Sequence, residues 1–306
     1  MGILHRHIHL LSMEKSRHPL SGHVLTLSQQ GVYATLDETI AIIRSHNIMP
    51  KDLRDDFDTK NKIPSWNNTR LKNVTNAQTV LSLLGADSVS VADCSTYENP
   101  NYVIDLNETV GKEFHDKFNV ILDVGTLEHV FDLPTALINV TRMLKSGGNI
   151  ILILPAAGLI DHGFYGISPT LLFDFFGNNG FDNISCYLLE ASQFNTAKKA
   201  KVYKYDHVGD QQVLISKKGV EVAFFATKKS TSTSNDPIIK PMQSLFLNMW
   251  QNQSNGNTPA QEVKQSIRKR ISSTFHYYVN DKYRPEFIRI YNHNRKRRNL
   301  RYIGKI

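Results

Sequence analysis

Residues 118–155 constrain the fold of this chain most strongly, since they predict a strand, an acidic turn, a helix and a second strand. The two strands are almost wholly apolar, as strands covered by helices on both faces must be. Pro134 is suited to begin the helix between them, and Gly147-Gly148 is expected to end it. This strand–helix–strand unit predicts a parallel sheet.

The same alternation of strand and helix extends through most of the chain. The predicted strands lie at 22–27, 88–92, 101–104, 118–122, 149–154, 181–189 and 220–227, and further helices at 36–48, 76–84 and 170–176. The last two strands lack a good intervening helix and therefore fit an antiparallel pair. We expect a doubly wound, mostly parallel α/β sheet.

Length and composition agree with a globular α/β protein. The 306 residues suffice for one large domain with additions, which we place at residues 1–229, with an insertion at about 50–74. Residues 230–306 are expected to form a linker and a basic, mostly helical extension. The apolar runs are shorter than the ~20 residues of a membrane span. Cys94 and Cys186 lack metal or redox spacing, so we expect buried thiols in a reducing, cytoplasmic compartment and no metal site.

Positive charge is concentrated at the C-terminal end of the chain. Residues 264–306 hold thirteen Lys and Arg against two acids, a net charge of +11, while the rest of the chain has 23 basic and 26 acidic residues. Tyrosines interleave with these charges, which suits nucleic acid, an acidic glycan or an acidic membrane surface. A solvated helical extension that packs its aromatic residues back on the domain explains the pattern equally well.

Three motifs together resemble the second half of a class I S-adenosylmethionine-dependent methyltransferase domain. They are Leu127-Glu128-His129-Val130, the helix end Leu144-Lys145-Ser146-Gly147-Gly148, and a strand that ends at Pro155. The resemblance covers about residues 24–227 and implies a Rossmann-like, seven-stranded sheet with S-adenosylmethionine as cofactor. The segment 162–169 is similar to one in a bacterial branch of the family, which implies a small-molecule or glycan-like acceptor.

The resemblance also implies a cofactor site after the first four strands. The matching positions are Ser28, Gln29 and Gly31 in the first turn, Asp93 for the ribose, Asp105 and Leu106 for the adenine, and Asp123 and Gly125 beside the sulfonium. Only Gly31 remains of the glycine-rich first turn that usually allows close backbone approach. Asp93 and Asp105 are equally suited to strand-end turns, and the sequence leaves that alternative open.

Glu128, His129 and His162 are the candidate catalytic residues, and His162 with Tyr165 the candidate acceptor-binding residues. Methyl transfer needs alignment, desolvation and sometimes a base, and histidine has a suitable pKa for that last task. The alternatives are local hydrogen bonding by Glu128-His129 and a helix entry capped by Ser168-Pro169.

Two other classes of function stay open. One is a nucleic-acid methyltransferase that uses the basic tail, although the usual motifs of base methylation are missing. The other is a non-catalytic binding module on a methyltransferase fold, which the degenerate first turn favours. A dehydrogenase is disfavoured because the first turn lacks Gly-x-Gly-x-x-Gly.

Overall fold

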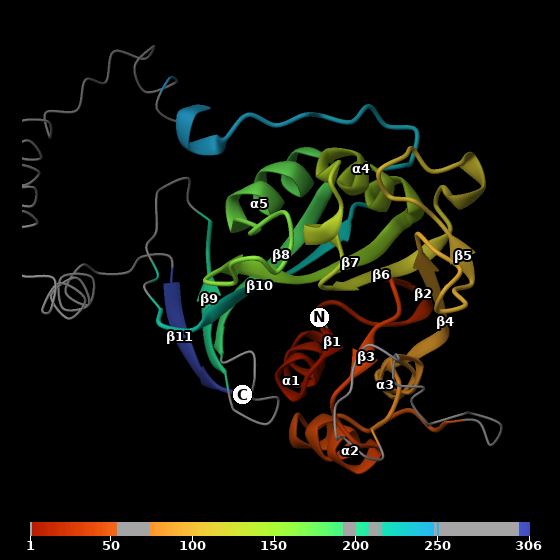
Figure 1. The fold of residues 1–306 in the computed structure, drawn as a ribbon, viewed down its shortest axis with the longest axis vertical. Coiled ribbons are helices and arrows are strands. Elements are labelled where there is room, and N and C mark those ends of the chain that lie inside the picture. The colour runs from red at the N-terminus through yellow and green to blue at the C-terminus, as the bar shows by residue number, and fades with distance from the viewer. Residues whose placement is uncertain are drawn as a thin grey trace, which may run out of the picture.

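The described residues form a central sheet with helices on both of its faces (Figure 1). The computed structural model describes residues 2–53, 74–191, 200–207, 214, 216–247, 250 and 300–306. Helices α1 (His5–Glu14), α2 (Leu36–Ser45) and α3 (Ala77–Leu83) cover one face of the sheet, and α4 (Leu133–Met143) and α5 (Pro169–Asn178) cover the other.

The sheet has the order β11-β9-β8-β10-β7-β6-β2-β4-β5. Its strands are β2 (Gly22–Leu27), β4 (Ala86–Asp93), β5 (Tyr102–Val103), β6 (Phe118–Val124), β7 (Leu144–Ala157), β8 (Phe181–Ala191), β9 (Lys201–Tyr205), β10 (Gly219–Lys228) and β11 (Leu300–Lys305). The pairs from β5 to β7 are parallel, and those from β7 through β10, β8 and β9 to β11 are antiparallel. The predicted parallel strands and the antiparallel closing pair are present, but the sheet as a whole is mixed, so the expectation of a mostly parallel sheet is confirmed only in part.

The expected number of seven strands is wrong, because the described residues form a nine-stranded sheet. One extra strand, β9, comes from the Lys-rich segment, where Val202, Tyr203 and Tyr205 are buried between lysines. The other, β11, comes from the basic tail and pairs with β9. Most of the expected helical extension, at residues 251–299, lies outside the described residues.

Helix α4 ends earlier than its sequence pattern predicts. The helix stops at Met143 because Leu144 is already extended and pairs with Phe118 of β6. Gly147, with a φ of +73°, lies in the irregular start of β7 before Asn149 pairs with Val120. Gly147 thus allows the left-handed backbone of an irregularity in β7, and it does not cap the preceding helix as the sequence predicts.

The first residues of the chain form structure that the sequence pattern does not predict. Strand β1 (Gly2–Ile3) pairs in parallel with β3 (Gly31–Val32), which follows the first turn of the sheet. Helix α1 then buries Arg6 and His7 together with its apolar residues. This N-terminal segment therefore lies against the same edge of the sheet as the candidate site.

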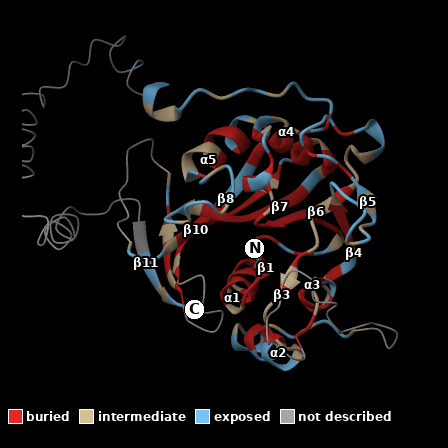
Figure 2. Ribbon diagram, in the orientation of Figure 1, coloured by how far each residue is buried: buried red, intermediate tan, exposed pale blue. Residues whose placement is uncertain are grey.

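Two apolar clusters fill the space between the sheet and its two helical layers, so that the sheet is buried along most of its length (Figure 2). Successive residues of a strand point to opposite faces. Leu25 and Ile121 accordingly join the cluster under α4 and α5, while Val24 and Val120 join the cluster under α1, α2 and α3. None of the described helices is long and apolar enough to cross a membrane.

The predicted linker after β10 packs against the main domain. The Ile239 amide donates to Asn179 Oδ1 at 2.7 Å, and the Ser244 amide donates to Asp174 Oδ2 at 2.9 Å. The division into 1–229 and 230–306 stays a prediction, as does the insertion, since 54–73 lie outside the described residues.

Candidate functional site

The first turn after β2 is closed by its own side chains. Ser28 is left-handed, with a φ of +58°, and its hydroxyl lies 2.9 Å from Thr126 Oγ1. The Gln30 amide donates to the Leu27 carbonyl at 2.5 Å and is itself buried. A glutamine side chain thus fills the space that a glycine-rich turn leaves open.

The other two predicted residues of this turn lie at its rim. Gln29 is half-buried, and Gly31 belongs to β3, opposite Gly2. A Cβ atom added at Gly31 has Tyr33 Cε2 at 3.9 Å as its nearest neighbour, so this glycine is not required by packing.

The two aspartates predicted to hold a nucleoside follow neighbouring strands. Asp93 ends β4, where it is half-buried and accepts hydrogen bonds from the Ser95 amide at 3.0 Å and the Ser95 hydroxyl at 3.3 Å. Asp105, after β5, is exposed and accepts from the Asn107 amide at 2.9 Å. Leu106 is buried in the core beside it. Both carboxylates make turn-type bonds and still lie at the predicted edge of the sheet.

Asp123 and Gly125 lie at the end of β6, as predicted. Asp123 is fully buried; its Oδ2 accepts from the Leu127 amide at 3.0 Å, and its Oδ1 has no hydrogen-bond partner among the described residues. Burial raises the pKa of Asp123 to about 6. Gly125 turns the chain with a φ of +89°, a conformation that favours glycine.

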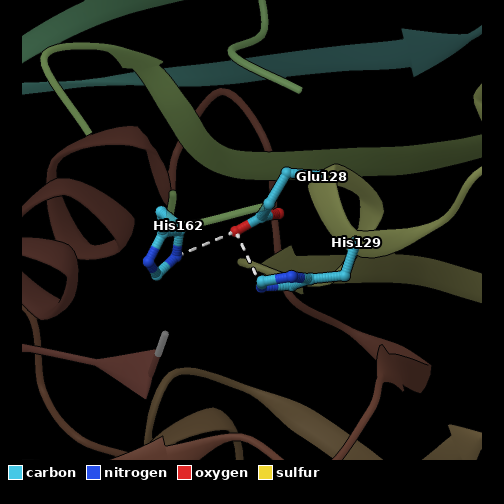
Figure 3. Close-up of side chains that lie close together, drawn as sticks. All are labelled: Glu128, His129 and His162. Carbon is cyan, nitrogen blue, oxygen red and sulfur yellow. Dashed lines mark ion pairs between the residues drawn. The ribbon is translucent and has the colours of Figure 1, made fainter. Parts of the chain in front are cut away.

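Glu128, His129 and His162 lie together at this edge, and both imidazoles approach one carboxylate oxygen (Figure 3). Glu128 Oε1 is 3.4 Å from His162 Nε2 and 3.7 Å from His129 Nε2. The two imidazole ring centroids are 5.3 Å apart. Glu128 and His129 come from the 3-10 helix η2 (Leu127–His129), and His162 comes from the loop after β7. The structure thus brings together the three predicted catalytic residues.

Burial differs sharply within this cluster and sets its protonation. Glu128 has no exposed surface, whereas 47% of the His129 side chain and 24% of the His162 side chain are exposed. Burial, assisted by the charge of Asp123, raises the pKa of Glu128 to about 8. Burial lowers the pKa of both histidines, so near neutral pH they are uncharged and each offers an unprotonated nitrogen.

The loop that carries His162 is held against η2 by backbone contacts. The Glu128 carbonyl accepts from the Phe164 amide at 2.8 Å and the Tyr165 amide at 3.2 Å. A Cβ atom at Gly163 would lie 2.8 Å from both Cγ and the carbonyl oxygen of Glu128, so only glycine allows this approach. The position of His162 relative to Glu128 therefore depends on Gly163.

Two further aromatic residues flank the site and are not obvious from the sequence. Phe131 and Phe164 are 72% and 67% exposed, with their rings 5.8 Å apart. Tyr165 donates its hydroxyl to the Phe131 carbonyl at 2.7 Å and packs against the core. The exposed pair of phenylalanines offers an apolar surface beside the two histidines.

The structure also shows a buried ionic cluster at the same edge, on β10 and α1. Glu221 accepts from Arg6 Nε at 2.9 Å and from Arg6 Nη2 at 2.6 Å, and His7 Nε2 lies 3.1 Å from Glu221 Oε2. Arg6 and Glu221 are 215 residues apart in the sequence, so no local signal predicts the contact.

No family model and no curated protein sequence matches this chain. Solved structures that resemble it include the YcgJ protein from Bacillus subtilis (10% identity, TM-score 0.35, covering 73% of this chain and 98% of that one). A SAM-dependent methyltransferase from Archaeoglobus fulgidus matches at 11% identity and a TM-score of 0.36, covering 72% and 94%. The CMeT domain of the citrinin polyketide synthase matches at 9% and 0.36, covering 70% and 48%.

Since these TM-scores are low, we assign the fold from the sheet itself. The order β5-β4-β2-β6-β7 is the 3-2-1-4-5 order of a doubly wound sheet, numbered from β2 as strand 1. Antiparallel β10 and β8 then close the sheet, as the sequence resemblance implies. The chain has a methyltransferase-like α/β fold.

Proposed function

We propose that this chain transfers a methyl group from S-adenosylmethionine to an oxygen or nitrogen atom of a small-molecule or glycan-like acceptor. The observation that carries the proposal is the position of the Glu128–His129–His162 cluster. It lies after β6, at the carboxyl edge of the sheet, where open α/β folds bind their ligands. The residues predicted to hold the cofactor follow β2, β4, β5 and β6 at this same edge.

The residues present fit the nucleoside part of the cofactor better than its methionine part. Asp93 ends β4 in a position suited to the ribose hydroxyls, and Asp105 follows the next strand. Asp123 has an unpartnered buried oxygen beside Gly125, which fits a cationic sulfonium nearby. In the first turn, however, Ser28 and Gln30 present side chains in place of a glycine backbone.

The cofactor supplies an already activated methyl group, so the chain has to position the acceptor and receive its proton. His129 and His162 are uncharged near neutral pH, and either imidazole can accept that proton. Glu128 beneath them keeps its own proton and orients the two rings. The exposed rings of Phe131 and Phe164 bind an apolar face of the acceptor.

The filled first turn favours a second candidate function, a non-catalytic binding module on this fold. The Gln30 side chain closes the turn from within, since it donates to both Leu27 and Ser28. The basic tail, most of which lies outside the described residues, is the proposed contact for an anionic partner under either function.

Calorimetric titration with S-adenosylmethionine and S-adenosylhomocysteine tests the proposal. We expect micromolar binding that Asp93→Asn weakens at least about tenfold, since the neutral amide loses charge-assisted bonds to the ribose. The control is Asp87→Asn, the same change at the opposite end of β4, and it should bind as the wild type does. Wild-type affinity in Asp93→Asn would contradict the proposed site. If neither ligand binds, the binding-module function is favoured.

A further inference from the structure

Three ligand-type side chains of the candidate site converge, and two of them have buried atoms without hydrogen-bond partners among the described residues. The donor atoms of Glu128, His129 and His162 all lie within 4.8 Å of one another. Among the described residues, both Glu128 carboxylate oxygens and His162 Nε2 are buried and have no hydrogen-bond partner. Buried polar atoms are almost always paired, so a group of three unpaired atoms that face one another requires an explanation.

A proton on Glu128 explains only part of this arrangement. It allows one bond, from the carboxyl group to a histidine nitrogen, and leaves the second carboxyl oxygen without a donor. Leaving a buried acceptor unsatisfied costs about 1–3 kcal/mol. A cation at the point where the three side chains meet would satisfy the carboxylate and both nitrogens at once.

We propose that Glu128, His129 and His162 bind a divalent transition-metal ion of the zinc class. Zinc–nitrogen and zinc–oxygen bonds of about 2.0–2.2 Å place the donors of a tetrahedral site about 3.3–3.6 Å apart. The distances from Glu128 Oε1 to the two histidine nitrogens are 3.4 and 3.7 Å. The carboxylate oxygen therefore lies within a few tenths of an ångström of the required spacing from each histidine nitrogen, and all three donor atoms lie within 4.8 Å of one another.

The ligand set indicates the class of metal and its use. Two imidazoles and one carboxylate suit zinc or ferrous iron, whereas calcium and magnesium prefer oxygen ligands alone. Three protein ligands leave a coordination position open, which is the arrangement of catalytic zinc sites. Exposure of His129 and His162 gives an incoming ligand access to that position.

The backbone holds the two halves of this metal site in register. Glu128 and His129 are adjacent on η2, and the Glu128 carbonyl binds the loop of His162 through the amides of Phe164 and Tyr165. The carboxylate and the distant histidine are thus linked by rigid contacts that do not involve their side chains. Such fixed spacing is what a metal site requires.

The metal site does not depend on the proposed methyl transfer. Only the use of the metal site depends on methyl transfer. If the chain is a methyltransferase, a cation here would bind an oxygen or nitrogen of the acceptor and lower the pKa of that acceptor group. The histidines would then serve as ligands, and the acceptor proton would pass to solvent. Metal binding and cofactor binding are separate measurements, so one can fail without the other.

Titration of the EDTA-treated full-length chain with Co²⁺, followed by visible absorption, tests the proposal. We expect one Co²⁺ per chain, with an absorption spectrum typical of a four- or five-coordinate nitrogen and oxygen site, and competition by Zn²⁺. Glu128→Gln and His162→Ala should each weaken binding at least about tenfold. Because His162 is on an exposed loop, its variant is expected to fold, which circular dichroism will check.

The matched control is His46→Gln, because His46 Nε2 lies 3.0 Å from His9 Nδ1 in a histidine pair that is separate from the Glu128–His129–His162 cluster. This variant should bind Co²⁺ as the wild type does. The proposal is wrong if the wild type does not bind at millimolar Co²⁺, or if Glu128→Gln and His162→Ala bind as tightly as the wild type. It is equally wrong if His46→Gln removes the signal. Titration with S-adenosylmethionine in EDTA separates these outcomes from failure of the cofactor site.

Discussion

Replacement of Glu221 by glutamine is expected to destabilise the protein severely. Glu221 is 2% exposed and lies between Arg6 and His7 of α1. Burial alone would raise its pKa, but the charges and hydrogen bonds of His7 and Arg6 outweigh it and lower the pKa to about 2. The pKa of His7 is itself lowered, chiefly by burial, so the charged pair is Arg6–Glu221.

The size of the effect follows from this pKa. The difference between the ordinary value of 4.5 and about 2 corresponds to about 3 kcal/mol of stability at neutral pH. Glu221→Gln also leaves the Arg6 guanidinium, 3% exposed, without a counter-charge. Loss of one partner from a buried ion pair typically costs about 3–5 kcal/mol. We expect a loss within that range.

Urea unfolding at pH 7, followed by circular dichroism, measures this loss. Asp87→Asn is the matched control, since it makes the same charge change in an exposed ion pair, 2.7 Å from Lys51. Its unfolding midpoint should stay within error of the wild type. The double variant Arg6→Met/Glu221→Gln should regain part of the lost stability. A loss of under about 1 kcal/mol in Glu221→Gln would refute the reasoning.

Three further predictions concern pH, the loop and α4. Because the pKa of Glu221 is lower in the folded state than the ordinary value of 4.5, its charge stabilises the fold at any pH above 4.5. Thermal stability should therefore fall as the pH is lowered from 4.5 toward about 2. In Glu221→Gln, which lacks this carboxyl group, the fall should be less steep. Gly163→Ala should cost about 1–3 kcal/mol in urea unfolding and weaken Co²⁺ binding, because the added Cβ would clash with Glu128. The control is Gly177→Ala on α5, which should not destabilise the protein, because an added Cβ there has no neighbour within 4 Å. Asn139→Ala should cost about 2–3 kcal/mol in the same assay, because the buried amide bonds Leu106, Glu108 and Val110; an unchanged midpoint would contradict this.

Much of the sheet could be predicted because its strands are locally encoded. Apolar runs separated by acidic turns and helices fix β2, β4, β6 and β7, and the lack of a helix between the last two predicted strands indicates the antiparallel pair. Long-range pairing is not encoded in this way. Helix α4 ends at Met143 because Leu144 pairs with Phe118, and β11 forms because it pairs with β9.

Helix α1 shows the same limit for buried polar residues. Its sequence carries Arg6 and His7 at positions that become fully enclosed. Taken alone, such residues indicate a surface segment. They are buried because Glu221, far along the chain, neutralises the arginine, and that pairing cannot be inferred without the fold.

For the candidate site, the residues could be predicted but not their environment. The Leu-Glu-His-Val and His-Gly-Phe-Tyr segments identify Glu128, His129 and His162 from sequence alone. Their convergence depends on the loop that docks through Gly163 onto the Glu128 carbonyl. The unpaired carboxylate of Glu128, on which the proposed metal site depends, becomes visible only when the structure shows this contact.

Two buried carboxylates at one edge of the sheet show why Glu128 is the more informative of the pair. Burial disfavours the charge on both, yet the pKa of Glu221 falls to about 2 while that of Glu128 rises to about 8. The two pKa values differ because the two carboxylates have different hydrogen-bond partners. Helix α1 provides a guanidinium and an imidazole to Glu221, whereas the described residues provide no hydrogen bond to either oxygen of Glu128. The fold thus neutralises one buried acid with an arginine and a histidine hydrogen bond, and it supplies no comparable side chain to Glu128 among the described residues. Since no described residue donates a hydrogen bond to Glu128, a proton or the proposed metal ion is the partner that its position favours.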